Sequence, residues 1–223
     1  MGKVLSQADR TEGLKTACRI PAVPLIPLFP LDLVLFPGIP LPLHIFEPRY
    51  KEMIGECLEQ KSAFGMVRAQ ENAVAEVGCS VEIVDVLKRY PDGRMDILTE
   101  GRRRFEVLAL DQERAFLRGE VMFLEDEPSS SSPQARKRAH EMHEQMMSLL
   151  GSDSDMPGSD SAALSYRLAA AIPTDLDFKQ TLLGVPSESE RIRLLIEYYE
   201  ATIPKIRQNL EARRKAGRNG QVR

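Results

Sequence analysis

The sequence predicts an α+β protein, in which an N-terminal curled β-sheet or pseudo-barrel with one helix precedes a C-terminal α-helical bundle that ends in a long helix. Three observations predict this class. Seven prolines lie between Ile20 and Phe46, which excludes a helix there. Short β-type runs separated by turn residues fill positions 64–125. Beyond a polar linker, apolar residues recur at helical spacing instead.

The most apolar stretch, PLFPLDLVLFPGIPLPLHIFEPRY, runs from Pro27 to Tyr50. A helical membrane span needs ~20 apolar residues, so its length would suffice. Each proline, however, removes a backbone donor and costs ~3 kcal/mol inside a helix. We therefore exclude a membrane span and expect short buried strands at 33–36 and 41–47, joined by a turn at Pro37-Gly38.

A single helix is expected from Pro48 to Lys61. Proline suits the first position of a helix, where its missing N–H is not needed. The apolar side chains that follow are spaced i, i+3, i+4, i+7 and i+8, which is one helical face. They are Tyr50, Met53, Ile54, Cys57 and Leu58.

The β-type runs predict further short strands, giving six or seven in all. Alternation in the run 79–90 places Val81, Ile83, Asp85 and Leu87 on one face. Pro91-Asp92-Gly93 is a strong turn signal. The expected strands are 64–69, 79–90, 94–101, 102–113 and 115–126.

The second half of the chain reads as helices. The serine- and proline-rich segment 125–134 separates them from the strands. Helices are expected at 133–150 and 162–172. A third helix is expected to begin at a capping box formed by Thr174 with Asp177 and to end at Gly184. A long fourth helix is expected to begin at Ser187 and to kink at Pro204.

These patterns divide the chain into five segments. A mixed-charge N-terminal stretch without an uninterrupted apolar run is expected to be a disordered leader over 1–19. The β-domain covers 20–126, the linker 127–133 and the α-helical bundle 134–216. A disordered tail is expected over 217–223.

Composition restricts the partners and the compartment. The formal net charge is −3, so nucleic acid is not the default partner. The three cysteines form no CxxC pair, which favours reduced thiols in a cytoplasmic protein over a disulfide framework.

No catalytic motif is complete. Neither a GxxxxGK[ST] phosphate loop nor a GxSxG elbow occurs. His140 and His143 stand at i and i+3, whereas a zincin needs i and i+4, so we expect a solvated helix face and leave weak metal binding as the alternative. His44 lies in an apolar strand and is expected to be a hydrogen-bonded structural histidine. No cofactor, metal or catalytic residue is predicted, although an enzyme of unknown type remains a hypothesis.

The basic run Arg102-Arg103-Arg104 suggests a nucleic-acid surface. Strand alternation would place Arg102 and Arg104 on one face and Arg103 with Phe105 on the other. Together with Phe116, such a face could contact RNA. The alternative is a solvated strand whose arginines pair with neighbouring acids, namely Glu100, Glu106 or Glu120.

Three motifs resemble the Lon protease N-terminal domain, in the same order and over about Pro24 to Leu210. PLFPLDLVLFPGIPLPLHIFEPRYKEMI resembles its proline-rich opening, and VEIVDVLKRYPDGRMDILTEGRRRFEVL resembles its later hairpin. LAAAIPTDLDFKQTLLGVPSESERIRLLIEYYEATI resembles its helical part.

The resemblance implies a PUA-like β-domain followed by a helical bundle, a module that in Lon helps recognise substrate proteins. In Lon an ATPase ring and a serine–lysine protease domain follow it. This sequence lacks the Walker motifs and that dyad, so the resemblance implies a stand-alone, non-catalytic protein-binding module. The expected partners are unfolded or partner proteins, including a full-length protease or another enzyme, and not a membrane. RNA binding through the PUA-like sheet is the alternative, and the oligomeric state is left open.

The binding surface is expected in a groove between the β-domain and the bundle. Some apolar residues of the opening stretch are also expected to stay exposed as a patch, drawn from Leu33, Phe36, Ile39, Leu41 and Phe46. The residues predicted for the protein-binding surface are Phe46, Tyr50, Tyr90, Arg102, Arg103, Arg104 and Phe116.

Overall fold

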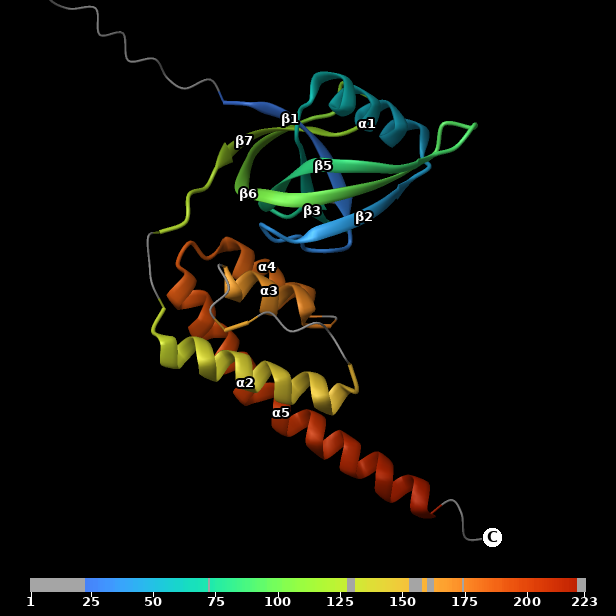
Figure 1. Ribbon diagram of the computed structural model, residues 1–223. Coiled ribbons are helices and arrows are strands. Elements are labelled where there is room, and N and C mark those ends of the chain that lie inside the picture. Colours follow the sequence, from blue (N-terminus) through green and yellow to red (C-terminus); the bar gives the residue numbers. More distant parts are fainter. Residues whose placement is uncertain are drawn as a thin grey trace, which may run out of the picture.

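The computed structural model describes residues 23–71, 73–127, 131–152, 158–159, 163–173 and 175–219 (Figure 1). The expected leader and positions 220–223 of the expected tail lie outside these residues. The strands are β1 (Leu25–Leu31), β2 (Pro40–Ile45), β3 (Phe64–Gln70), β4 (Ala73–Val74), β5 (Val77–Arg89), β6 (Met95–Asp111) and β7 (Arg118–Phe123). The helices are α1 (Pro48–Gln60), α2 (Pro133–Leu150), α3 (Leu164–Ala171), α4 (Leu176–Gly184) and α5 (Glu188–Asn219).

The sheet curls into a closed barrel. Its strand order is β1-β7-β6-β5-β3-β4, and β1 also pairs in parallel with β3, which closes the ring of strands and leaves the short β4 outside it. β2 pairs with the first part of β6, and β7 pairs with its last part. The α+β class, with a curled sheet first and helices after it, is confirmed (Figure 1).

The first expected strand was wrong. Residues 33–36 form no strand, and β1 lies earlier, at Leu25–Leu31. This strand tolerates Pro27 because it changes partner there: it is antiparallel to β7 up to Pro27 and parallel to β3 from Leu28. Phe36 is nevertheless fully buried, in irregular backbone that lies beside Gly101 of β6.

The two strands expected at 94–101 and 102–113 are one continuous strand, β6. Gly101, which looked like a break between them, is buried beside the backbone of Phe36. A Cβ at this position would lie 2.3 Å from the Phe36 carbonyl oxygen. The glycine therefore serves close packing inside a strand.

Helix α1 covers one side of the barrel core, as its apolar spacing predicted. Tyr50, Met53, Ile54 and Cys57 are all buried. Their neighbours include Phe29, whose ring stacks on that of Tyr50 at 4.0 Å between centroids. This packing orients β2, which leads directly into the helix.

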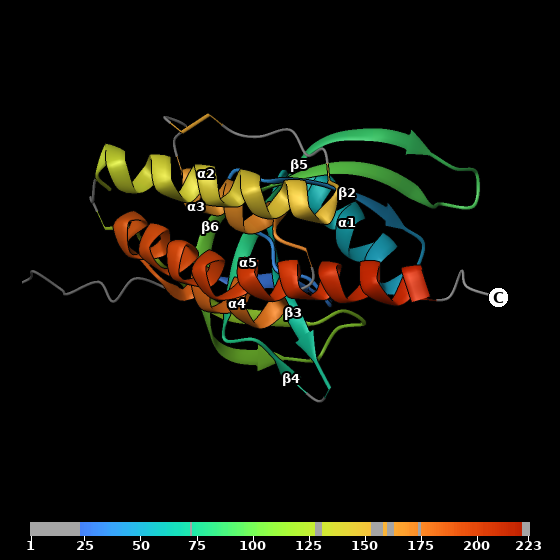
Figure 2. The same cartoon turned by 90° about the horizontal axis from the view of Figure 1, so that it is seen from below.

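The remaining helices form the bundle, in which α2 and α5 lie side by side (Figures 1 and 2). α3 and α4 lie between this pair and the barrel (Figure 1). The N-cap of α4 is Asp175, whose carboxylate accepts a hydrogen bond from the Phe178 amide at 3.0 Å. The prediction that Thr174 caps this helix was therefore wrong. Thr174 itself lies outside the described residues. α5 contains Pro204, as expected, and extends to Asn219. Within the described part of the chain, no helix is long and apolar enough to cross a membrane.

Candidate functional site

An exposed apolar surface lies on the outer side of the sheet region that we call the arm, where β2 and residues 82–89 of β5 pair with residues 95–100 of β6. The strand register sets His44, Asp96 and Lys88 in one row across the three strands. Phe46, at the end of β2, is 58% exposed and stacks against His44.

Two β-bulges add apolar side chains to this face. The register of β5 shifts between Ile83 and Asp85 and again between Val86 and Lys88. Ile83 and Val86 pack against the barrel core, whereas Val84 and Leu87 are 52% and 56% exposed. The expected alternation was thus wrong after Ile83, because each bulge adds a residue to one strand. We call the outward set of Phe46, His44, Tyr90, Val84 and Leu87 the arm surface.

Charged groups hold the aromatic end of the arm surface in place. Asp96 accepts hydrogen bonds from the Tyr90 hydroxyl at 2.8 Å and pairs with His44 Nδ1 at 2.5 Å. The bond to His44, and then that to Tyr90, lowers the pKa of the Asp96 carboxyl. Lys88 and Arg94 both lie over the Tyr90 ring, at 4.6 and 4.9 Å. His44 is hydrogen-bonded, as expected, but its side chain is 45% exposed.

The free edge of β2 is protected against strand addition. The Gly101 amide donates to the Ile39 carbonyl oxygen at 3.0 Å. The backbone N–H and C=O groups of odd-numbered residues in β2 therefore point toward β6. Pro40 and Pro42 therefore occupy positions whose backbone groups point away from β6, and neither has an N–H to offer. A partner on the arm surface would thus contact side chains rather than extend the sheet.

The predicted site residues do not all reach the surface. Tyr50 and Phe116 are only 6% and 2% exposed, because both belong to the core around α1. Phe36 is fully buried, and Leu33, Ile39 and Leu41 pack partly against that core, which leaves Phe46 as the largely exposed member of the expected apolar patch.

The three arginines do not alternate as predicted. Arg102 and Arg103 are both exposed, whereas Arg104 is 2% exposed and lies beside buried Phe105. The irregular pairing of β5 with β6 between Cys79 and Val81 breaks the alternation. Each arginine has acidic partners: Arg102 pairs with Glu82 and Glu100, Arg103 with Glu125, and Arg104 with Asp126.

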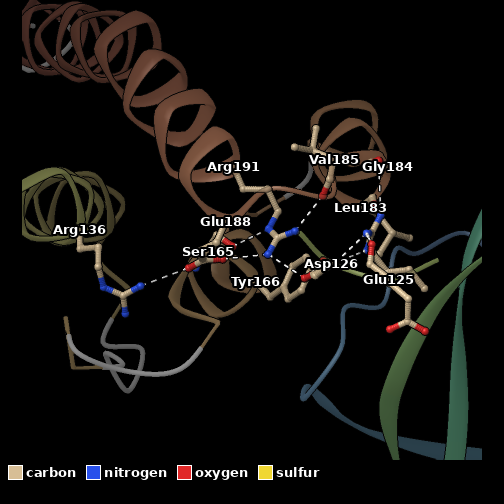
Figure 3. Close-up of polar contacts among 11 residues, drawn as sticks. Glu125, Asp126, Arg136, Ser165, Tyr166, Leu183, Gly184, Val185, Glu188 and Arg191 are labelled. Atoms are coloured by element: carbon tan, nitrogen blue, oxygen red, sulfur yellow. Dashed lines mark hydrogen bonds and ion pairs between the residues drawn. The ribbon is translucent and has the colours of Figure 1, made fainter. Parts of the chain in front are cut away.

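Arg104 belongs to a network that joins the barrel to the bundle, of which Figure 3 labels Asp126, Leu183 and Arg191. Asp126 accepts from Arg104 Nε at 2.8 Å and from Arg191 of α5 at 3.0 Å, so one carboxylate links two buried guanidinium groups. Arg104 also donates to the Leu183 carbonyl oxygen at the end of α4, at 3.1 Å. The sequence patterns did not indicate these roles for Asp126 and Arg191, whose partners are distant in the chain.

A cavity of about 400 Å³ lies at the junction of the barrel and the bundle. Its walls come from the segment after β1, from β3, from both ends of the α3–α4 connection and from α5. The lining residues are Asp32, Arg68, Pro173, Asp175, Leu176, Asp177 and Tyr198. None of the residues predicted for the binding surface lines this cavity, although its position matches the expected groove.

His143 is buried, which corrects the solvated helix face expected for this segment. It is 0% exposed between α2 and α5, where Nδ1 bonds the Tyr199 hydroxyl at 2.7 Å. Burial, and then the nearby His140, lowers the pKa of His143 to about 4. Among the described residues, no cluster of three or more histidine, cysteine or acidic side chains is placed to hold a metal ion.

This burial predicts acid sensitivity. An unfolded histidine takes up a proton near its usual pKa of about 6.5, whereas folded His143 does so only near 4. The contribution of neutral His143 to the free energy of unfolding is therefore present above pH ~6.5 and lost as pH falls toward ~4. Between pH 7.5 and pH 5, this loss should lower the free energy of unfolding of wild type by about 2 kcal/mol. We expect His143→Gln, which can retain a bond to Tyr199, to lack this part of the decrease. Urea unfolding at both pH values measures this, with His140→Gln as control, and an unchanged pH dependence in His143→Gln would contradict it.

Comparisons with known proteins identify a family whose match covers most of this chain. The model of the ATP-dependent protease La (LON) substrate-binding domain matches residues 25–200. Lon protease of Parabacteroides distasonis is 34% identical over 127 residues, covering 53% of this chain and 15% of the relative. Lon protease 1 of Hydrogenovibrio crunogenus is 26% identical over 191 residues, covering 77% and 23%. The chain therefore spans less than a quarter of the length of either relative.

Two solved structures support the fold. The Lon N-terminal domain protein from Xanthomonas campestris is 27% identical, with a TM-score of 0.65 and coverage of 79% of this chain and 99% of that one. The N-terminal domain of Mycobacterium avium complex Lon protease, at 19% identity and a TM-score of 0.59, shows the fold alone over 79% and 98%. The resemblance indicated by the three sequence motifs is confirmed, and the chain belongs to the Lon substrate-binding domain family.

Proposed function

We propose that this chain is a non-catalytic protein-binding module whose arm surface holds apolar segments of unfolded or partner proteins. One observation carries the proposal: Phe46, Val84 and Leu87 of the arm are each more than half exposed, at 58%, 52% and 56%, while the chain neighbours that precede them pack into the barrel core. Exposed large apolar side chains that gather on one face are typical of interaction surfaces. The proline-protected edge of β2 leaves these side chains as the contact.

The family supports binding rather than hydrolysis, because the matched model is that of a substrate-binding domain. We also propose that the protein acts in the cytoplasm. The free, buried thiols of Cys57 and Cys79 support this, because they suit a reducing compartment.

RNA binding through the sheet finds less support. Arg104 is buried, and Arg102 and Arg103 are paired with carboxylates. Each of these pairs would have to be exchanged for a phosphate contact. Single-stranded RNA is therefore included in the test as a competing ligand.

The test removes two of the exposed apolar side chains of the arm surface. We expect Phe46→Ser/Leu87→Ser to weaken binding of an unfolded protein at least tenfold, because covering one large apolar side chain contributes about 1.5–3 kcal/mol when burial is complete. Fluorescence anisotropy of a labelled, permanently unfolded protein measures the affinity. Leu110→Ser, which changes a 45% exposed leucine near the other end of β6, is the matched control and should bind like wild type.

A folded form of the same labelled protein and a single-stranded RNA complete the design. Equal binding of the folded and unfolded forms, or binding of neither, would refute the proposal. Binding of RNA alone, with steep loss on adding salt, would move the function to the arginines. An unchanged affinity in the double variant would remove the arm surface from the proposal.

A further inference from the structure

The cavity at the junction of barrel and bundle, which we call the junction cleft, differs in chemistry from the arm surface. Three carboxylates, those of Asp32, Asp175 and Asp177, line it together with one guanidinium, that of Arg68. Its apolar lining comes from Pro173, Leu176 and Tyr198. The cleft therefore combines a formally negative rim with an apolar wall.

Part of this negative charge has no cation bound to it. Asp177 pairs with Arg68 NH1 at 2.6 Å. Among the described residues, no lysine or arginine forms an ion pair with Asp32 or Asp175. The neighbouring Lys179 directs its ammonium to the Ala170 carbonyl oxygen at 3.1 Å. The carboxylate of Asp32 is thus available to an incoming cation, whereas that of Asp175 also caps α4 through the Phe178 amide and bonds the Tyr198 phenol.

Tyr198 forms a firm part of the wall. Its ring stacks on Phe178 with centroids 4.2 Å apart. Burial, and then the adjacent Asp175 carboxylate, raises the pKa of the Tyr198 phenol, so this wall is neutral at physiological pH. An aromatic face beside carboxylates suits the aliphatic stem and the charged head of a basic side chain.

The apolar wall distinguishes a basic side chain from a free metal ion as the occupant. A lysine or arginine offers an apolar stem together with its charged head, and the stem can pack on Leu176 and Tyr198. A free metal ion has no such stem.

We propose that the junction cleft binds a lysine or arginine side chain of the bound polypeptide. This inference rests on the proposed function and adds a preference: clients that carry a basic residue near an apolar segment bind more tightly than those without one. Charge complementarity selects the occupant, since a cationic head meets Asp32 and Asp175 while its stem packs on Leu176 and Tyr198.

Two fluorescein-labelled peptides test the preference. They share one apolar sequence and differ only in carrying several lysines or several glutamines. We expect wild type to bind the lysine peptide about five- to tenfold more tightly at low salt, with the difference shrinking at high salt. Asp32→Asn/Asp175→Asn should abolish the difference and leave the glutamine peptide unaffected, because asparagine still caps α4.

The controls separate this inference from the proposed function. Asp92→Asn changes an exposed acid in the β5–β6 turn and should keep the preference. Phe46→Ser should weaken both peptides alike. Equal wild-type affinity for the two peptides, or a preference that survives in the Asp32/Asp175 variant, would overturn the inference alone. Binding of neither peptide would overturn the proposed function and this inference with it.

Discussion

Replacing Arg191 by methionine is expected to destabilise the protein by about 3–5 kcal/mol, the usual cost of removing one partner from a buried ion pair. The Arg191 side chain is 2% exposed and donates four hydrogen bonds. The acceptors are Ser165 Oγ at 2.9 Å, the Val185 carbonyl oxygen at 2.8 Å, and Asp126 and Glu188 at 3.0 Å each (Figure 3).

The loss would extend beyond one pair, because the acceptors are shared. Glu188 also accepts from the Ser165 amide at 3.1 Å, and Asp126 also bonds Arg104 of β6. The Arg191 guanidinium lies 4.0 Å from the centroid of the Tyr166 ring. Methionine would fill part of the volume but leave two carboxylates without their shared cation.

Arg193→Met is the matched control. It removes the same charge two residues further along α5, but this side chain is 53% exposed and pairs with Glu190 and Glu197 on the helix surface. Exposed pairs contribute about 0–1 kcal/mol, so little change is expected. Urea unfolding followed by circular dichroism compares the two variants, and equal stability losses would show that the network does not hold barrel and bundle together.

Gly101→Ala is expected to cost about 3 kcal/mol, at the upper end of the usual penalty for overpacking. The added Cβ would lie 2.3 Å from the carbonyl oxygen and 3.0 Å from the carbonyl carbon of Phe36. These are backbone atoms, and they cannot rotate away as a side chain could. The Gly38 amide donates to the Gly101 carbonyl oxygen at 2.8 Å, which holds the two segments in place.

Gly55→Ala provides the contrast. Apart from the two chain neighbours and the nearby backbone of α1 itself, no atom lies within 4 Å of a Cβ added at Gly55, in the middle of this helix. Alanine favours helix over glycine by about 1 kcal/mol, so this variant should be as stable as wild type or more stable. Thermal or urea unfolding of both variants checks the pair. A Gly101→Ala protein as stable as wild type would mean that the Phe36 segment shifts freely.

Local signals predicted the helices better than the strands. α1 and α2 begin at Pro48 and Pro133, as their proline and capping signals indicated, because such signals act within a few residues. The position of β1 and the continuity of β6 through Gly101 depend on partners far along the chain. No local pattern contains that information.

The candidate site shows the same division. Phe46 was predicted as exposed from its place in an apolar run, but Val84 and Leu87 were missed, and a bulge moves Leu87 off the face that Val81 and Ile83 share. The run Val84-Asp85-Val86-Leu87, which breaks strict alternation, was the available signal. Whether Tyr50 or Phe116 reaches the surface depended on the packing of α1 against the barrel.

By itself, the sequence determined the order of strands before helices and the exclusion of a membrane helix from the proline-rich opening, because proline chemistry and periodicity act locally. Three of its motifs carried the resemblance to the family. Only the tertiary structure decided the closure of the barrel through β1 and β3, the burial of Arg104 and the formation of the junction cleft. Arg104, for example, differs from Arg103 in that its acceptors include Asp126 and the Leu183 carbonyl oxygen, 79 positions later in the chain. Burial of a charge depends on such distant partners, which are brought together only when the chain has folded.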